Sequence, residues 1–244
     1  MNTGDEQGFY SRQLGLPGWG TDTQNKLKAS TVFIAGAGGL GSPVLFYLAA
    51  AGVGTLLVCD SDDVDLTNLN RQILHSFNSI GSNKVESARK TILGLNPFVN
   101  FFPVKTRITS SNAERLVGES DIIIDCLDNF KARRVLNNVS VNKNIPMVHA
   151  GVSEMRGQIT FLHPPETPCL SCFLPMNDTK KKNNIVGATA GVMGSLQALE
   201  AIKYLTGIGQ PLKNRLLFWD GVSMNFETIG IRKNPRCRIC RNAV

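Results

Sequence analysis

The sequence predicts an α/β fold built on a Rossmann-like, doubly wound and mostly parallel sheet that antiparallel strands extend. Three observations predict it. Apolar strand-like runs alternate with helical patterns up to about residue 150, a glycine-rich turn joins the first strand to the first helix, and a more antiparallel pattern follows residue 151. The chain has 244 residues, of which 42% are hydrophobic and 18% charged. This globular composition excludes a disordered chain, a collagen-like repeat and a coiled-coil rod.

The first part of the chain supplies the alternating elements. Strands are predicted at residues 31–35, 55–59, 100–104, 122–127 and 147–150, and helices at residues 40–51, 83–95, 111–117 and 129–143. Helix caps support this assignment: Ser82 and Glu86 mark the start of the second helix, Pro97 follows its end, and Asn129 can cap the fourth. Strands that alternate with helices favour a mostly parallel, doubly wound sheet.

The pattern changes after residue 151. A strand with alternating polarity is predicted at residues 156–163, followed by a loop that carries proline and cysteine. Residues 180–187 form a predicted exposed loop, and a long helix is expected at 191–205, before strands at 215–219 and 225–231. This part is short and mixed, so we expect an extension packed on the first sheet.

Charge and hydropathy limit the possible partners and locations. The net charge of 26 − 19 = +7 favours an anionic partner such as a nucleotide or an acidic protein, and does not require a nucleic acid. Residues 29–59 carry no charge and could span a bilayer, but their glycines and Pro43 favour buried strands and a buried helix. Residues 1–8 lack the pattern of a signal peptide. We therefore expect a soluble, cytoplasmic protein without a membrane partner.

The glycine-rich turn has the spacing of a phosphate-binding loop. Gly36, Gly38, Gly39 and Gly41 fit the G-x-G-x-x-G pattern between a strand and a helix. Such glycines permit a tight turn and bring the free amides of a helix N-terminus close to phosphate. Asp60 ends the next strand, where a carboxylate can accept hydrogen bonds from a ribose. The loop alone does not distinguish NAD from ATP, and it could also serve only close helix packing.

Polar and charged residues follow the next strand ends. Arg71 offers a planar set of donors to phosphate, and Lys84 begins the following predicted helix. Asp128 follows a buried strand, and one or two carboxylates with phosphate oxygens are what Mg²⁺ prefers. Each of these residues taken singly could also belong to a solvated loop or a helix cap.

Together these motifs resemble a known family. G-A-G-G-L-G, D-x-D-x-V-x-x-x-N-L-N-R-Q from Asp60, Lys84 and D-x-x-D-N from Asp125 are similar in order and spacing to the MoeB/ThiF/HesA adenylyltransferases, the bacterial relatives of ubiquitin-activating enzymes. The resemblance runs from Tyr10 to the last cysteine pair. It implies a single ThiF-type domain over residues 1–244, with a nucleotide-binding part at 1–150 and a carrier-binding, zinc-bearing extension at 151–244.

The resemblance also implies an activity. Members use ATP to adenylate the C-terminal glycine of a small ubiquitin-fold sulfur carrier of the MoaD/ThiS type, which ends in Gly-Gly, and release pyrophosphate. A separate sulfur donor then acts on the acyl-adenylate. The enzyme is expected to be a homodimer, in which Arg12 reaches ATP bound to the other subunit.

The family's functional residues carry over to this chain position by position. Arg71, Lys84, Asp128 and Arg12 would be catalytic, and Asp128 would also bind Mg²⁺. The implied nucleotide-binding residues are Gly36, Gly38, Gly39, Gly41, Asp60, Asp62, Asn68, Arg71, Gln72, Lys84, Asp128 and Asn129.

Four of the six cysteines form two C-x-x-C pairs, and two such pairs can form a closed tetrahedral zinc site with a structural role. Disulfides and thiol redox activity are the alternatives, and the absence of a secretion signal disfavours the first. The remaining two cysteines, Cys59 and Cys126, lie at the ends of apolar strands and are expected to be small buried hydrophobes. The four candidate zinc ligands are Cys169, Cys172, Cys237 and Cys240.

One segment departs from the family pattern. Some members carry a reactive cysteine in the loop before the long helix, whereas residues 179–189 of this chain contain none, and Lys180 stands at or near that position. We therefore expect the reaction to stop at the acyl-adenylate. The lysines at 180–182 are either a solvated run or an electrostatic contact for an acidic carrier.

Two other functions compete with adenylation. A nicotinamide-dependent oxidoreductase is compatible with the glycine loop but does not explain Arg71, Lys84 and Asp128. A non-catalytic scaffold is the third possibility, although no matching position of the nucleotide site is lost. The histidines show no metal-binding spacing: His75 is expected to flank the site, and His149 and His163 to be structural.

Overall fold

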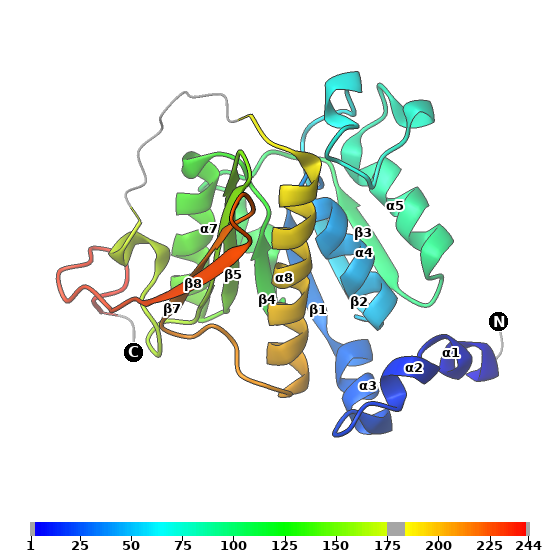
Figure 1. The fold of residues 1–244 in the computed structure, drawn as a ribbon, viewed down its shortest axis with the longest axis horizontal. Helices are drawn as coiled ribbons and strands as arrows, with labels where there is room; N and C mark the ends of the chain where they lie inside the picture. The colour runs from blue at the N-terminus through cyan, green and yellow to red at the C-terminus, as the bar shows by residue number, and fades with distance from the viewer. Residues whose placement is uncertain (1–2, 175–183, 243–244) are drawn as a thin grey trace.

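The computed structural model describes residues 3–174 and 184–242. The lysine run at 180–182 lies outside the described residues. Within them, one sheet of eight strands has the order β3-β2-β1-β4-β5-β6-β7-β8. Figure 1 shows helices on both faces of this sheet. The predicted doubly wound fold is confirmed.

The first five strands form the parallel part. Register pairs Thr31 with Thr55, Val32 with Ile122 and Asp125 with His149. The strands are β1 (Thr31–Ala35), β2 (Thr55–Cys59), β3 (Asn100–Val104), β4 (Ile122–Asp125) and β5 (Met147–Ser153). The helices between them are α4 (Gly41–Ala51), α5 (Lys84–Leu95), α6 (Ala113–Val117) and α7 (Phe130–Lys143), with 3₁₀ turns η1 (Leu66–Asn68) and η2 (Phe77–Ser79).

The remaining strands continue the same sheet with antiparallel pairing. Strand β5 pairs in parallel with β4 and antiparallel with β6, so the direction changes at this strand. The later elements are β6 (Arg156–Leu162), the 3₁₀ turn η3 (Leu170–Cys172), α8 (Gly187–Thr206), β7 (Arg215–Asp220) and β8 (Asn225–Gly230). The predicted antiparallel extension is therefore present.

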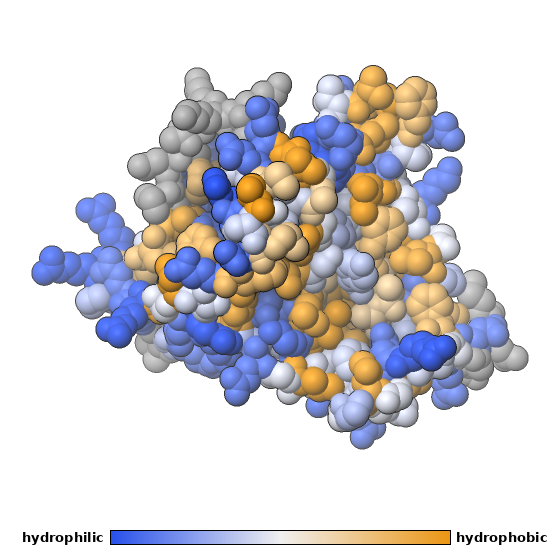
Figure 2. Space-filling model, viewed as in Figure 1, coloured by the Kyte–Doolittle hydropathy of each residue, from blue (hydrophilic) through white to orange (hydrophobic). Residues whose placement is uncertain are grey.

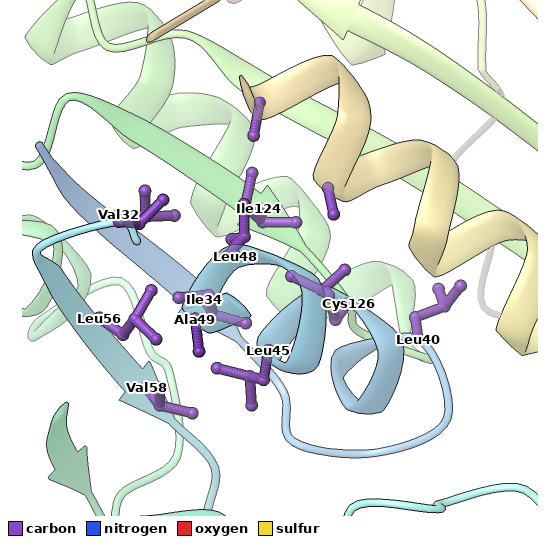
Figure 3. Packing of buried hydrophobic residues seen from close by; sticks show 14 of the residues in the cluster. Val32, Ile34, Leu40, Leu45, Leu48, Ala49, Leu56, Val58, Ile124 and Cys126 are labelled. Carbon is purple, nitrogen blue, oxygen red and sulfur yellow. The ribbon is translucent and has the colours of Figure 1, made fainter. Parts of the chain in front are cut away.

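The core has two layers because side chains alternate between the faces of a strand. Val32 and Ile34 pack on the side of α4 and α8, whereas Phe33 packs on the side of α6 and α7. Figure 3 shows Leu45 and Leu48 of α4 lying over residues of β1, β2 and β4. The apolar, uncharged run at 29–59 thus forms strands β1 and β2 and the helix α4 that packs on them.

The N-terminal segment contains helices that the sequence analysis did not predict. They are α1 (Thr3–Phe9), α2 (Ser11–Leu14) and α3 (Gly20–Ala29). Long-range hydrogen bonds anchor them: Asn96 donates to the Tyr10 hydroxyl at 2.8 Å, and the Gln13 amide donates to the carbonyl of Ala51 at 2.7 Å. Because these partners lie far along the chain, local periodicity gives little sign of the helices.

Helix α8 begins at Gly187, before the predicted start at residue 191. The Thr189 hydroxyl donates to the carbonyl of Glu154 at 3.0 Å, which attaches the first turn to the β5–β6 connection. Gly187 lies so close to the chain at Asn70 that a Cβ atom would be 2.3 Å from its carbonyl oxygen. Tertiary packing therefore makes residues 187–190 helical, although the sequence around Gly187 is typical of a loop.

Gly41 offers a test of the close approach between the glycine-rich turn and α4. A Cβ atom on Gly41 would lie 2.1 Å from the carbonyl oxygen of Gly36, whereas one on exposed Gly94 of α5 would meet nothing within 4 Å. We expect Gly41→Ala to lower the free energy of unfolding by about 2–3 kcal/mol through overpacking. Gly94→Ala should leave it unchanged or raise it by up to about 1 kcal/mol. Urea denaturation measures both, and a Gly41→Ala protein as stable as the wild type would contradict this account.

Candidate functional site

A cavity of about 1250 Å³ opens at the carboxyl ends of the parallel strands. We call it the sheet-edge cavity. This is the edge at which open α/β sheets bind ligands. Ten of the residues predicted for the nucleotide site line it: Gly36, Gly38, Gly39, Asp60, Asp62, Arg71, Gln72, Lys84, Asp128 and Asn129.

The glycine-rich turn forms one wall of the cavity. Gly36 has φ = +101°, and a Cβ atom there would lie 2.8 Å from the carbonyl oxygen of Cys126 at the end of β4. Only glycine allows this conformation and this close contact. Within the described part of the chain, the amides of Gly38 and Gly39 have no protein acceptor, so they remain available for an anionic ligand.

His75 forms a hydrogen bond with the backbone of this turn. Its Nε2 lies 2.8 Å from the carbonyl oxygen of Ala37, and its Nδ1 lies 2.9 Å from the hydroxyl of Ser87. A carbonyl only accepts, so Nε2 carries the proton and Nδ1 accepts from the serine. Burial lowers the pKa of His75, which favours this neutral form. His75 thus flanks the cavity wall, as the sequence predicts.

Asp60 holds the same turn through its carboxylate. One oxygen accepts from the amide of Ala37 at 2.8 Å, and the other accepts from the amide of Asp62 at 2.9 Å. Each carboxylate oxygen keeps a further acceptor site. Asp60 can therefore order the glycine-rich turn and still receive a hydrogen bond from a ligand in the cavity.

Lys84 places a positive charge in the cavity wall. It is the first residue of α5, which is capped by the Asn83 side chain accepting from the amide of Val85 at 3.2 Å. The Lys84 ammonium donates to a carboxylate oxygen of Asp62 at 3.0 Å. The Lys84 side chain is 8% exposed and that of Asp62 61%, so the ammonium is held at a defined place behind an open carboxylate.

The segment before His75 supplies two further polar groups. The Arg71 guanidinium donates to the carbonyl of Thr67 at 2.8 Å and to the side chain of Asn70 at 3.1 Å. Gln72 is buried, and its Oε1 atom has no hydrogen-bond partner among the described residues. An orphaned acceptor beside a cavity fits a site whose hydrogen bonds are completed by a ligand.

The end of β4 contributes the candidate metal-binding carboxylate. Asp128 is exposed and lines the cavity. Asn129 caps α7, since its side-chain oxygen accepts from the amide of Ala132 at 2.9 Å. An open carboxylate at a cavity edge, opposite clustered cations, suits Mg²⁺ shared with phosphate oxygens.

A buried network beneath Asp128 was missed by the sequence analysis. The Asp125 carboxylate forms an ion pair with Arg133 at 3.3 Å and accepts from Nδ1 of His149 at 2.7 Å. Burial tends to raise the pKa of Asp125, but the charge of Arg133 and these hydrogen bonds lower it overall. Burial lowers the pKa of His149, so the network consists of a carboxylate, a guanidinium and a neutral imidazole.

The sequence carried a weak signal for Arg133. It lies three residues before Leu136 and four before Asn137, both of which are buried on the same face of α7. An arginine on the apolar face of a helix must find an acceptor, because an unpaired buried charge is costly. The identity of that acceptor depends on strands elsewhere in the chain.

Three predicted residues do not line the sheet-edge cavity. Gly41 packs against the backbone of Gly36 inside the molecule. Asn68 closes a capping box, accepting from the amide of Asp65 at 3.2 Å. Arg12 is exposed on α2, which lies with α3 near the amino end of β1, at the opposite edge of the sheet (Figure 1).

Cys59 and Cys126 also line the cavity. Burial raises the pKa of Cys59 to about 12 and raises the pKa of Cys126 well above its ordinary value. Both thiols therefore stay protonated near neutral pH, and they behave as the small buried side chains that the sequence predicts.

The four remaining cysteines come together at a second site. Their sulfur atoms lie within 4.8 Å of one another, with 3.7 Å between Cys169 and Cys237 and 3.4 Å between Cys172 and Cys240. Zn–S bonds of about 2.3 Å in a tetrahedron place sulfur atoms about 3.8 Å apart. All four cysteines are free in the structure, and the geometry fits a closed zinc site.

The comparisons with known proteins assign the chain to a family. The model described as "ThiF family" matches residues 10–239. The chain belongs to the ThiF family.

Relatives of this ThiF-family chain share its sequence over most of its length. The SAMP-activating enzyme E1 of Haloferax volcanii is 40% identical over 237 residues, covering 95% of this chain and 87% of that protein. The sulfur carrier protein adenylyltransferase of Thermus thermophilus is 37% identical over 249 residues, covering 98% and 92%. The adenylyltransferase and sulfurtransferase MOCS3 of Drosophila yakuba is 41% identical over 245 residues, but the chain spans only 54% of that protein.

Solved structures have the same fold. The crystal structure of E. coli MccB with ATP superposes with a TM-score of 0.87 at 26% identity, covering 96% of this chain and 75% of that one. SeMet PaaA has a TM-score of 0.81 at 24% identity, covering 95% and 84%. In the described ranges of the ThiF-family chain, no helix combines the length and apolar character needed to cross a membrane.

The cysteine cluster leads to a prediction for metal content. Cys240→Ser should lower bound zinc from about one ion per chain to less than half, because one of four thiolate ligands is lost. It should also lower Tm. Cys59→Ala is the control, since Cys59 is buried in β2 outside the cluster and its loss should leave the zinc content unchanged. Atomic absorption on both purified variants measures this, and unchanged zinc in Cys240→Ser would rule out the four-cysteine site.

Proposed function

We propose that this chain uses ATP to adenylate the C-terminal glycine of a small ubiquitin-like sulfur-carrier protein and releases pyrophosphate. One observation carries the proposal. The sheet-edge cavity gathers free glycine-turn amides, two cationic side chains and an open carboxylate at the edge where α/β sheets bind nucleotides. The relatives named adenylyltransferases support the same reaction class.

The chain's own residues account for nucleotide binding. The amides of Gly38 and Gly39, at the N-terminus of α4, face the phosphates, and Asp60 receives the ribose. Lys84 and Arg71 neutralise the phosphate oxygens, and the free acceptor of Gln72 takes a donor from the ligand. Asp62 keeps the Lys84 ammonium in place until phosphate arrives.

The chemistry is an attack of one anion on another. An oxygen of the carrier's carboxylate forms a bond to the α-phosphorus, and the bond to the oxygen bridging the α- and β-phosphates breaks, so pyrophosphate leaves with that electron pair. Like-charge repulsion opposes the approach, and the positions of Lys84 and Arg71 reduce it. Mg²⁺ held by Asp128 would supply further charge neutralisation on the phosphate oxygens.

We assign the nucleotide to residues 1–150 and the carrier to residues 151–244. The cavity continues along Gly151, Gln158 and Phe218 of β5, β6 and β7, which gives a polypeptide tail a path to the phosphates. Beside this path the β7–β8 hairpin exposes hydrophobic side chains, which are visible in Figure 2. They are Val222, Met224, Phe226 and Ile229. This apolar surface suits the folded body of a carrier.

The proposal includes a homodimer and a separate sulfur donor. Arg12 lies at the opposite sheet edge from the cavity of its own chain, so it reaches a nucleotide only in a second subunit. Residues 179–189 contain no cysteine, and the thiols in the cavity are protonated. We therefore propose that the reaction stops at the acyl-adenylate, which another protein converts to the thiocarboxylate.

Pyrophosphate exchange tests the activity. With Mg·ATP and a Gly-Gly carrier, labelled pyrophosphate should enter ATP in a carrier-dependent way. NADH binding without exchange would favour an oxidoreductase, and neither response would favour a scaffold.

Asp128→Ala should reduce this exchange by at least about 100-fold while leaving Tm unchanged, since an exposed carboxylate with a role in metal binding is removed. Asp22→Asn, which alters an exposed carboxylate of α3, is the control and should exchange like the wild type. Full activity in Asp128→Ala would remove Asp128 from the mechanism.

The absence of a covalent intermediate is a separate prediction. Intact-mass spectrometry of a reaction with enzyme, carrier and Mg·ATP should show free enzyme and adenylated carrier. A mass equal to enzyme plus carrier less one water, lost on treatment with a thiol, would show a thioester and contradict the proposal.

A further inference from the structure

Strands β4 and β5 stop pairing with each other where the sheet-edge cavity begins. Their parallel ladder ends at the pair Asp125 and His149. Beyond it the chain after β4 runs through Leu127 to Asp128, while β5 continues to Gly151 and pairs only with β6. Both segments line the sheet-edge cavity, so its width at this place depends on groups other than the ladder.

Arg133 of α7 spans the separated strand ends. Its guanidinium donates to the carbonyl of Leu127 and, at 3.0 Å, to the carbonyl of Ala150. Leu127 directly precedes Asp128, and Ala150 directly precedes Gly151. One buried side chain therefore joins the segment that carries the candidate metal ligand to the segment that faces the carrier.

Asp125 fixes both the guanidinium of Arg133 and the backbone of Leu127. Its carboxylate pairs with Arg133 and also accepts from the amide of Leu127 at 3.1 Å. Residue 127 is thus held through its amide by Asp125 and through its carbonyl by Arg133. His149 donates to the Asp125 oxygen that pairs with Arg133, which limits the orientations of that carboxylate.

A purely stabilising role does not explain this arrangement. Buried ion pairs add little net stability compared with apolar side chains of similar size. The guanidinium additionally lies over the ring of Phe130, 5.5 Å from its centroid, and Phe130 also lines the cavity. Two of the groups that Arg133 contacts, Leu127 and Phe130, line the cavity, and Ala150 directly precedes the lining residue Gly151.

We propose that Arg133 is a positioning residue that sets the distance between the Asp128 segment and the Gly151 segment, with Asp125 and His149 holding its guanidinium. This role rests on the proposed adenylation reaction, because a fixed distance matters when a carboxylate must meet the phosphate that Asp128 helps to orient. Arg133 itself lines the cavity, and its positioning role acts through the two carbonyls.

Kinetics of Arg133 variants test the role. Arg133→Met should lower kcat for pyrophosphate exchange about 10- to 100-fold, raise the Mg²⁺ concentration for half-maximal rate, and change the KM for ATP less than threefold. Arg133→Lys keeps the charge but loses the planar set of donors, so it should recover only a small part of kcat. Lys143→Met is the control and should match the wild type, because it removes a partly exposed cation at the C-terminal end of α7 that pairs with Glu119, a residue outside this helix.

Two variants of His149 keep the test usable if Arg133→Met fails to fold. Asparagine can place an N–H near the position of Nδ1, so His149→Asn should retain most of kcat, whereas His149→Leu should lower it. Equal loss in both variants, or wild-type kcat and Mg²⁺ dependence in folded Arg133→Met, would overturn the proposal.

Hydrogen–deuterium exchange tests the positioning role independently of the proposed adenylation activity. In the unliganded protein, Arg133→Met should speed exchange in peptides covering residues 127–130 and 151–153 together, at least fivefold, with β1 unchanged. An inactive wild type with this exchange pattern in Arg133→Met would refute adenylation and support the positioning role. Unchanged exchange in both segments would refute the positioning role even if the wild type is active.

Discussion

The contact between the glycine-rich turn and the end of β4 is the constraint on which the site depends. At Gly36 and Gly41 there is no room for a Cβ atom, because the turn packs against the backbone of Cys126 and folds back on itself. This contact brings the amides at the start of α4 beside the segment that carries Asp128. The proposed nucleotide would then meet these amides and the candidate metal ligand in one cavity.

Behind that contact, buried polar groups keep the cavity wall in one conformation. Neutral His75 holds the turn, while Asp125 and Arg133 hold the β4 end from the side of α7. On the other face of the sheet, buried Gln197 of α8 donates to the carbonyl of Asp125 at 2.8 Å. The hydrogen bonds of these buried groups favour a single arrangement, since breaking one of them leaves a buried polar atom without its partner.

Helix α7 connects the site with the cysteine cluster. Its N-terminal part carries Arg133, and one turn later Asn137 accepts from the amide of Leu170 at 2.8 Å, next to Cys169. A metal bound by the cluster would therefore fix the C-terminal tail to the helix that shapes the cavity.

Features that depend on local backbone geometry could be predicted from the sequence. The glycine spacing, the acid after β2 and the paired cysteines require particular conformations or ligand sets, so the parallel sheet, the position of the turn and the cysteine cluster could be predicted. Local pattern did not reveal the helices before β1, the early start of α8, or the pairing of Arg133 with Asp125. It also could not decide that Gln72 faces the cavity while nearby Asn68 caps a turn. These depend on contacts between residues far apart in the chain, and only the packed tertiary structure brings such partners together.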